Sequence, residues 1–333
     1  MKKYRKLILL IVLVLSVAGM FIFAITDRKD SEQEYRNAFA RHYRIFSPEL
    51  PVRLDFAGES VPLQIFYVRE SLDREILVGT FMHSYTQQMF KRANRYFPVI
   101  EPILKKMRIP DDFKYLAIAE SNLGNVTSPA GAEGVWQFLP ATGRKYGLEV
   151  NADIDERYNL EKATFAACNY LQEAYDTFEN WTLAAAAYNR GIDGLMKTLK
   201  SQQVNNYYDL FFSEETARYI FRILAAKEIY THPVQYGFYL KSSDFYPVIP
   251  TDTITVDTTI NDLPRFALQL GINYRMLREF NPWIQSYRLP DKSGKIYRFI
   301  LPKKEFIDIT RNPKKTDEVE TYFHDTLKIN QLH

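Results

Sequence analysis

Cysteine, excess charge and strand-like patterning are all scarce in this chain. Cys168 is the only cysteine, which excludes a disulfide framework and a cysteine-based metal site. The formal net charge is +3 over 333 residues and no dense basic stripe occurs, so no nucleic-acid partner is expected. Alternation of polar and apolar residues is nearly absent before residue 240, which predicts a mainly α protein over most of its length.

One long stretch without charge does occur, near the N-terminus. Basic residues at positions 2, 3, 5 and 6 precede the uncharged run 7–26, and Asp27 is the first charge after it. A run of about twenty such residues can span a bilayer as a helix, and the basic residues before it predict an N-terminus inside the cytoplasm. No cysteine lies near the end of the run, which excludes a bacterial lipoprotein anchor. We therefore predict a signal anchor, a transmembrane helix, over residues 1–27.

This anchor predicts a protein of the cell envelope, held in the cytoplasmic membrane with its body in the periplasm. A cleaved signal peptide is the alternative, although the run exceeds the usual length and lacks a clear A-x-A cleavage site. Both interpretations place the body of the protein outside the cytoplasm.

Composition divides the rest of the chain into further segments. Residues 28–60 are polar and interrupted by prolines and a glycine, as expected of a connector. Helical patterns fill residues 61–245, which we expect to form one all-helical domain. Residues 252–303 indicate a strand, two short helices and a closing strand, a small β-α-α-β unit. Residues 304–333, rich in lysine, aspartate and threonine, are expected to form a flexible tail.

A carboxylate on an apolar helical face is the first candidate for chemistry. In the stretch 113–120, three apolar residues and Glu120 follow one another at i, i+3, i+4 and i+7, and Gly124 is expected to end the helix. Desolvation favours the neutral form of a carboxyl group and raises its pKa, as a general acid near neutral pH requires. The alternative is a glutamate that turns out to water at a fraying helix end.

Four short segments stand in a fixed order around and after this acid. They are Glu120-Ser121, then Ser128 to Pro140 with Gly131-x-x-Gly134-x-x-Gln137-x-x-Pro140, then Ala187-Tyr188-Asn189-x-Gly191, then Glu215-Thr216-x-x-Tyr219. In order and spacing they resemble the lytic transglycosylases of bacterial cell walls, whose catalytic domain has a goose-lysozyme-like fold. The resemblance covers about residues 60–235, which makes 61–245 the expected catalytic domain.

The resemblance implies both the substrate and the site. The substrate would be the glycan strands of peptidoglycan, with no metal and no organic cofactor, and protein partners are left unspecified. Glu120 would be the catalytic residue, protonating the glycosidic oxygen and then accepting a proton from the C6 hydroxyl as the 1,6-anhydro ring closes. The implied substrate-binding residues are Ser121, Ser128, Gln137, Tyr188, Asn189, Glu215 and Tyr219.

Several of these residues also have plain structural interpretations. Gln137 offers an amide to sugar groups, whereas its segment could be only a loop before the next helix, with the neighbouring aromatic residues 136 and 138 in the core. We expect both to hold, with the aromatic residues mainly in the core and Gln137 toward the substrate groove. Tyr188 could be a core tyrosine with a satisfied hydroxyl. Glu215 and Tyr219 lie four apart, so Glu215 could be half of an exposed helix pair.

Two departures from the family pattern leave alternatives open. Glu133 occupies a position where the family has a small residue, and it could supply the second carboxylate of a muramidase that uses water. The unit over 252–303 resembles a LysM glycan-binding module but has Asp257-Thr258-Thr259 in place of Gly-Asp-Thr, so it could instead be a purely structural cap. A non-catalytic wall-binding protein is the third possibility, against which the intact Glu120 argues.

Overall fold

The structure, a computed structural model, describes residues 4–5, 11–20, 33–38, 45–290 and 295–307. The chain divides into two compact units, Met1–Ser47 and Pro48–His333, each of which is described by itself. In the first unit, residues 11–20 are helical, and the rest of the expected membrane run 7–26 lies outside the described residues. Among the described residues, no helix has the length and apolar character needed to cross a membrane. The anchor stays a prediction from the sequence.

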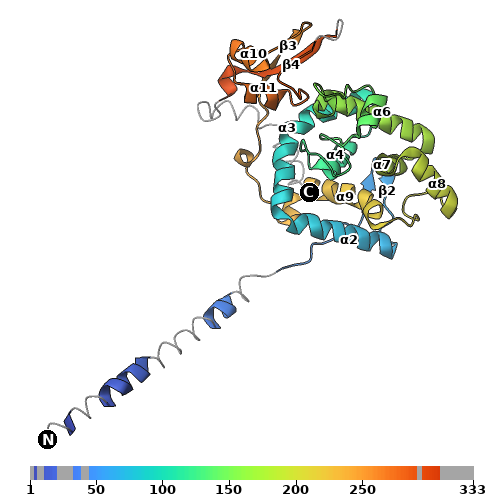
Figure 1. The fold of residues 1–333 in the computed structure, drawn as a ribbon. Helices are drawn as coiled ribbons and strands as arrows, with labels where there is room; N and C mark the ends of the chain where they lie inside the picture. Colours follow the sequence, from blue (N-terminus) through green and yellow to red (C-terminus); the bar gives the residue numbers. More distant parts are fainter. Residues whose placement is uncertain (1–3, 6–10, 21–32, 39–44, 291–294, 308–333) are drawn as a thin grey trace. The chain divides into compact units, whose positions relative to one another are not determined.

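The second unit is mainly helical up to residue 240, as predicted. Figure 1 shows α4 inside a ring of longer helices, and α4 contacts α3 and α9 directly. The helices are α2 (Phe66–Phe81), α3 (His83–Met107), α4 (Phe113–Ser121), α5 (Pro140–Lys145), α6 (Leu160–Phe178), α7 (Trp181–Arg190), α8 (Ile192–Gln202) and α9 (Glu214–Thr231). The central position of α4 explains why almost all of its residues are buried, including Phe113 and Leu116.

The end of α4 differs from the sequence expectation. Asn122, not Gly124, caps the helix, with a left-handed backbone (φ 51°, ψ 38°) that asparagine adopts more readily than most residues. Leu123 also has a positive φ of 55°, and its side chain is fully buried. Glu120 therefore lies in the last turn of α4, as expected.

A short hairpin belongs to the helical core rather than to a connector. It is formed by β1 (Asp55–Phe56) and β2 (Glu59–Ser60), paired antiparallel. Phe56 is fully buried and its ring meets that of Phe113 edge to face, with centroids 5.2 Å apart. The connector expected over 28–60 is therefore too long at its C-terminal end, because the two buried residues Leu54 and Phe56 form an alternation too short to detect.

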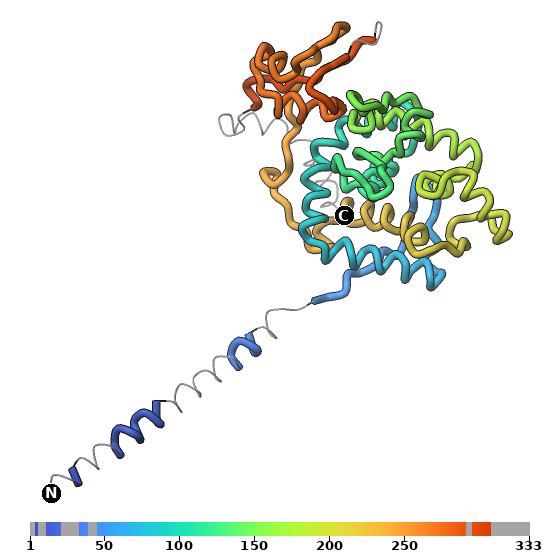
Figure 2. The backbone as a smooth tube through the Cα atoms, in the orientation of Figure 1, coloured from blue at the N-terminus to red at the C-terminus, as the bar shows by residue number. Residues whose placement is uncertain are grey.

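The C-terminal part of the second unit has the predicted β-α-α-β order. It contains β3 (Thr251–Val256), α10 (Leu263–Gln269), α11 (Tyr274–Phe280) and β4 (Tyr297–Pro302), and the tube in Figure 2 traces the path that returns β4 beside β3. The strands pair antiparallel from Thr251↔Pro302 to Val256↔Tyr297. Most of the expected tail, residues 308–333, lies outside the described residues.

Candidate active site

Glu120 is half-buried at the end of α4, facing α9. The Tyr219 hydroxyl donates a hydrogen bond to the Glu120 carboxylate. Burial raises the pKa of Glu120 to about 7, although the Tyr219 hydrogen bond and the positive charge of Arg222 both lower it, and Glu215 raises it further. The carboxyl group is therefore desolvated rather than turned out to water, and it can both give and accept a proton near neutral pH.

Two tyrosines flank the acid. Tyr219 lies on α9 and Tyr188 lies near the end of α7, which Gly191 terminates with a φ of 79°. Burial is the main cause that raises the pKa of both phenols well above 10, and the charge of Glu120 adds to it. Both hydroxyls therefore stay protonated. The Tyr188 hydroxyl donates to the Trp136 carbonyl oxygen at 2.8 Å, so its hydrogen bond is satisfied by backbone, as the core interpretation expected.

The glycine segment forms a compact turn, residues 131–138, beside the acid. Gly131 and Gly134 have φ values of 79° and 78°. A Cβ at Gly134 would lie 2.1 Å from the Arg157 carbonyl oxygen, so only glycine fits there, whereas a Cβ at Gly131 would meet nothing within 4 Å. Gln137 also has a positive φ, and its amide nitrogen donates to the Gly134 carbonyl at 2.8 Å.

The polar and aromatic residues in and beside this turn stabilise its conformation. Gln137 donates a second bond to the Val126 carbonyl at 2.8 Å, so its NH₂ group holds the turn together. Trp136 and Phe138 are buried, which confirms the expectation that they belong to the core. Ser121 is buried and donates to the Val135 carbonyl at 2.8 Å, tying the residue after Glu120 to the turn.

The remaining predicted site residues are Ser128, Asn189 and Glu215. The Ser128 hydroxyl accepts a hydrogen bond from the Ala132 amide at 3.0 Å, inside its own loop. Asn189 and Glu215 are exposed, at the end of α7 and in the first turn of α9. Within residues 45–290, no hydrogen bond joins Ser128 or Asn189 to Glu120. The structure thus brings Glu120, Tyr219 and Tyr188 together, with Glu215 acting through its charge.

Glu133, the candidate second carboxylate, is engaged elsewhere. Its carboxylate accepts hydrogen bonds from the Tyr158 hydroxyl and, at 2.8 Å, from Thr127, and it lies 4.0 Å from Arg157. Its backbone bridges Thr127 and Phe138. These bonds make Glu133 part of the framework of the loop, so the site supplies no support for it as a catalytic base.

Arg222 is a site residue that sequence reasoning missed. It lies one turn after Tyr219 on α9, at a spacing of three, and its Nε atom is 3.9 Å from the Glu75 carboxylate. Glu75 is buried on α2, where Arg218 also binds it, with Nε to Oε1 at 2.7 Å. The available signal was the face of α9 that carries Glu215, Tyr219 and then Arg222 at i, i+4 and i+7.

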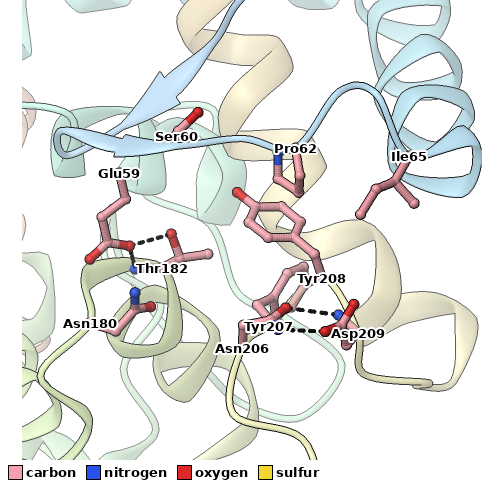
Figure 3. A pocket seen from close by; sticks show the side chains of 10 residues that line it. All are labelled: Glu59, Ser60, Pro62, Ile65, Asn180, Thr182, Asn206, Tyr207, Tyr208 and Asp209. Atoms are coloured by element: carbon pink, nitrogen blue, oxygen red, sulfur yellow. Dashed lines mark hydrogen bonds between the residues drawn. The ribbon is translucent and has the colours of Figure 1, made fainter.

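A pocket of about 290 Å³ lies apart from this site (Figure 3). Its wall includes Glu59 of the hairpin, whose carboxylate accepts hydrogen bonds from the backbone N–H groups of Trp181 and Thr182, 2.5 and 2.9 Å away. Glu59 thereby caps the N-terminus of α7, the helix that carries Tyr188. The pocket contains none of the predicted site residues: it is lined by Glu59, Ser60, Pro62, Ile65, Asn180, Thr182, Asn206, Tyr207, Tyr208 and Asp209. Across the described part of the chain, no group of three or more His, Cys, Asp or Glu residues could hold a metal ion.

Comparison with known families agrees with the fold. Residues 97–211 match the transglycosylase SLT domain, a segment that includes Glu120, Gln137 and Tyr188. Residues 252–305 match the soluble lytic transglycosylase C-terminal LysM-like domain. The chain therefore contains a transglycosylase SLT domain followed by a LysM-like domain.

Curated relatives point to the same class. Membrane-bound lytic murein transglycosylase D of Escherichia coli (strain K12) is 29% identical over 243 residues, which is 71% of this chain and 52% of that protein. The protein of the same name from Escherichia coli O6:H1 gives the same values. A putative tributyltin chloride resistance protein of Alteromonas sp. (strain M-1) is 25% identical over 144 residues, 43% of this chain and 69% of that protein. The chain thus spans about half the length of the first two relatives.

Proposed function

We propose that the protein is a peptidoglycan lytic transglycosylase that cleaves the β-1,4 bond between N-acetylmuramic acid and N-acetylglucosamine. The observation that carries this proposal is the half-buried, desolvated Glu120, with a pKa of about 7 and a hydrogen bond from Tyr219, inside an SLT domain. A carboxyl group poised at this pKa suits a mechanism in which one residue serves as acid and then as base.

In the first step, protonated Glu120 donates its proton to the glycosidic oxygen. The bond from that oxygen to C1 of the muramic acid breaks, and N-acetylglucosamine leaves with a free hydroxyl group. Positive charge develops at C1, where the N-acetyl group of the same sugar and nearby polar groups stabilise it. The Tyr219 hydroxyl, which stays protonated, stabilises the carboxylate that Glu120 has become.

In the second step, the C6 hydroxyl of the muramic acid attacks C1. Its proton passes to the Glu120 carboxylate, which returns the acid to its starting form, and a 1,6-anhydro ring closes without water. An intramolecular nucleophile acts at a high effective concentration, so a second carboxylate to activate water is unnecessary. The remaining residues proposed to bind the glycan strand are Ser121, Ser128, Gln137, Tyr188, Asn189 and Glu215.

The relatives and the N-terminal sequence together support a location for the protein in the cell. Relatives named as membrane-bound lytic murein transglycosylases indicate the cell envelope. The uncharged run 7–26 after basic residues supports a helix that anchors the protein in the cytoplasmic membrane, with the catalytic domain in the periplasm.

The products distinguish this function from its alternatives. Purified protein is incubated with peptidoglycan, and the released muropeptides are analysed by mass spectrometry. Anhydromuramic ends support the transglycosylase, reducing ends indicate a muramidase, and the absence of any product indicates a binding protein with the fold of an enzyme.

The activity is expected to fall as pH rises through about 7, because Glu120 must start protonated. Arg222 lowers the pKa of Glu120, so Arg222→Gln should move this alkaline limb to higher pH. Glu215 raises that pKa, so Glu215→Gln should move the limb to lower pH. The measurement is kcat/KM against pH, with Glu214→Gln, the exposed neighbour in the same turn, as the control that leaves the limb in place. Shifts of the same sign in both variants would contradict this electrostatic account.

A further inference from the structure

The LysM-like domain shares its hydrophobic core with a loop of the helical domain. This docking loop, residues 149–156, contributes Ile154, which is fully buried in the domain's own apolar cluster together with Trp283. Ile154 pairs with Ile284 in an isolated β-bridge. The Asp155 amide donates to the Trp283 carbonyl at 2.8 Å. The domain is therefore built around a side chain that the catalytic half of the protein supplies.

Polar contacts surround this shared core. Glu149 of the docking loop accepts hydrogen bonds from Lys295 and, at 3.1 Å, from the Tyr297 hydroxyl. Arg288 lies 3.5 Å from the Asp153 carboxylate. The first residue and the middle of the docking loop are thus held by residues of the LysM-like domain, which limits the conformations open to the loop.

Arg157 passes this constraint to the active-site turn. It is buried, and its Nε and Nη2 atoms donate to the Asp155 carboxylate at 2.9 and 2.6 Å. Its Nη1 atom donates to the Gly131 carbonyl at 2.9 Å and to the Phe138 carbonyl at 3.0 Å. These two carbonyls stand at the first and last residues of the turn. One guanidinium therefore fastens both ends of the turn to the docking loop.

Backbone carbonyls of the active-site turn hold two side chains next to the proposed acid. The Val135 carbonyl accepts the bond from Ser121, the residue after that acid, and the Trp136 carbonyl accepts the bond from Tyr188. Hydrogen bonds thus connect Trp283 through Asp155 and Arg157 to the two ends of the turn, and the backbone of the turn connects them to the bonds beside the proposed acid.

We propose that the LysM-like domain positions the active-site turn 131–138. Ile154 and Arg157 are positioning residues in this arrangement, because they act on the turn and do not contact the substrate. The effect on turnover rests on the proposed function, whereas the effect on the order of the turn does not.

The test compares Ile154→Asp with the parent and with two controls in the full chain. A carboxylate in the dry cluster is expected to undock the domain, while Ile154→Val keeps it docked and Leu268→Asp places the same charge on an exposed position of α10. Hydrogen exchange is measured over the turn 131–138 and over α3. Ile154→Asp should speed exchange in the turn and lower kcat by about 10- to 100-fold, with KM changed little, because the acid and its partners lose their alignment. Both controls should match the parent.

Faster exchange around Trp283 with unchanged exchange in the turn and unchanged kcat would overturn the proposal. If hydrogen exchange in α3 is also faster in Ile154→Asp, that variant has lost structure beyond the turn, and Arg157→Lys is tested in its place. Lysine keeps the positive charge but cannot bond Asp155 and both carbonyls at once. Arg157→Lys should speed exchange in the turn, and unchanged exchange there would equally overturn the proposal. If the parent shows no activity on peptidoglycan, the proposed function fails, and the exchange measurement still decides whether the domain positions the turn.

Discussion

Replacing Glu120 with glutamine is expected to reduce the release of anhydro-muropeptides by about 10²- to 10⁴-fold, the usual loss for a removed acid–base group. Glutamine has nearly the same shape and can still accept the hydrogen bond from Tyr219, but it can neither give nor take the proton. The measurement is the initial rate of product release by the full chain at pH 6. Retention of most of the parent's activity would mean that another group is the acid.

A stability measurement separates lost chemistry from lost folding. The folded pKa of Glu120, about 7, lies above its ordinary value of 4.5, so folding favours the protonated form. Its contribution to stability is complete below pH 4.5 and is lost as pH rises through about 7. Glutamine does not titrate, so Glu120→Gln should gain on the order of 2 kcal/mol over the parent between pH 4.5 and pH 8. Urea denaturation of the parent and the variant at both pH values tests this, and a difference in stability between them that does not change from pH 4.5 to pH 8 would contradict it.

Gly134→Ala is expected to destabilise the protein by roughly 3 kcal/mol or more, because the new Cβ would meet the Arg157 carbonyl oxygen at 2.1 Å and the turn or its neighbour must shift. Gly131→Ala is the matched control. It has nearly the same positive φ but open space around the Cβ position, so it should cost only the backbone strain, roughly 1–2 kcal/mol.

Urea denaturation, followed by the fluorescence of buried tryptophan such as Trp136, gives both values. The Gly134 variant should also lose activity in its remaining folded fraction, because the displaced turn carries the carbonyls that hold Ser121 and Tyr188. Equal losses of stability in the two alanine variants would show that the close approach to Arg157 is unimportant.

Local patterns in the sequence were sufficient to predict the helical domain, the β-α-α-β unit and a desolvated acid. The i, i+3, i+4 and i+7 spacing up to Glu120 is a property of one helix, and burial of that helix follows from it. Leu54 and Phe56 show the limit of such reasoning, because two buried residues in a polar segment form too short a pattern to reveal a strand. The end of α4 at Asn122 was also not predicted, because both asparagine and glycine occur at left-handed positions after helices and Gly124 gave the stronger signal.

The features that the sequence did not predict depend on contacts between segments that lie far apart in the chain. Arg222 shares a helical face with Tyr219, but its action on Glu120 depends on how α9 packs against α4. The role of Ile154 in the core of a domain that begins about a hundred residues later could not be predicted, because periodicity says nothing about which segment a buried residue meets. Gln137 and Ser121 were identified from their motifs, yet their bonds to backbone carbonyls could be assigned only from the folded turn.

The central claim is that Glu120 works without an activated water molecule, and digestion of peptidoglycan in ¹⁸O-labelled water tests it most directly. Mass spectrometry of the released muropeptides reads out whether the new ends contain oxygen from the solvent. The account predicts 1,6-anhydro ends without label, because the C6 hydroxyl supplies the oxygen that joins C1. Labelled reducing ends would show that water is the acceptor, would contradict the account, and would direct attention to Glu215, the acid whose charge acts on Glu120.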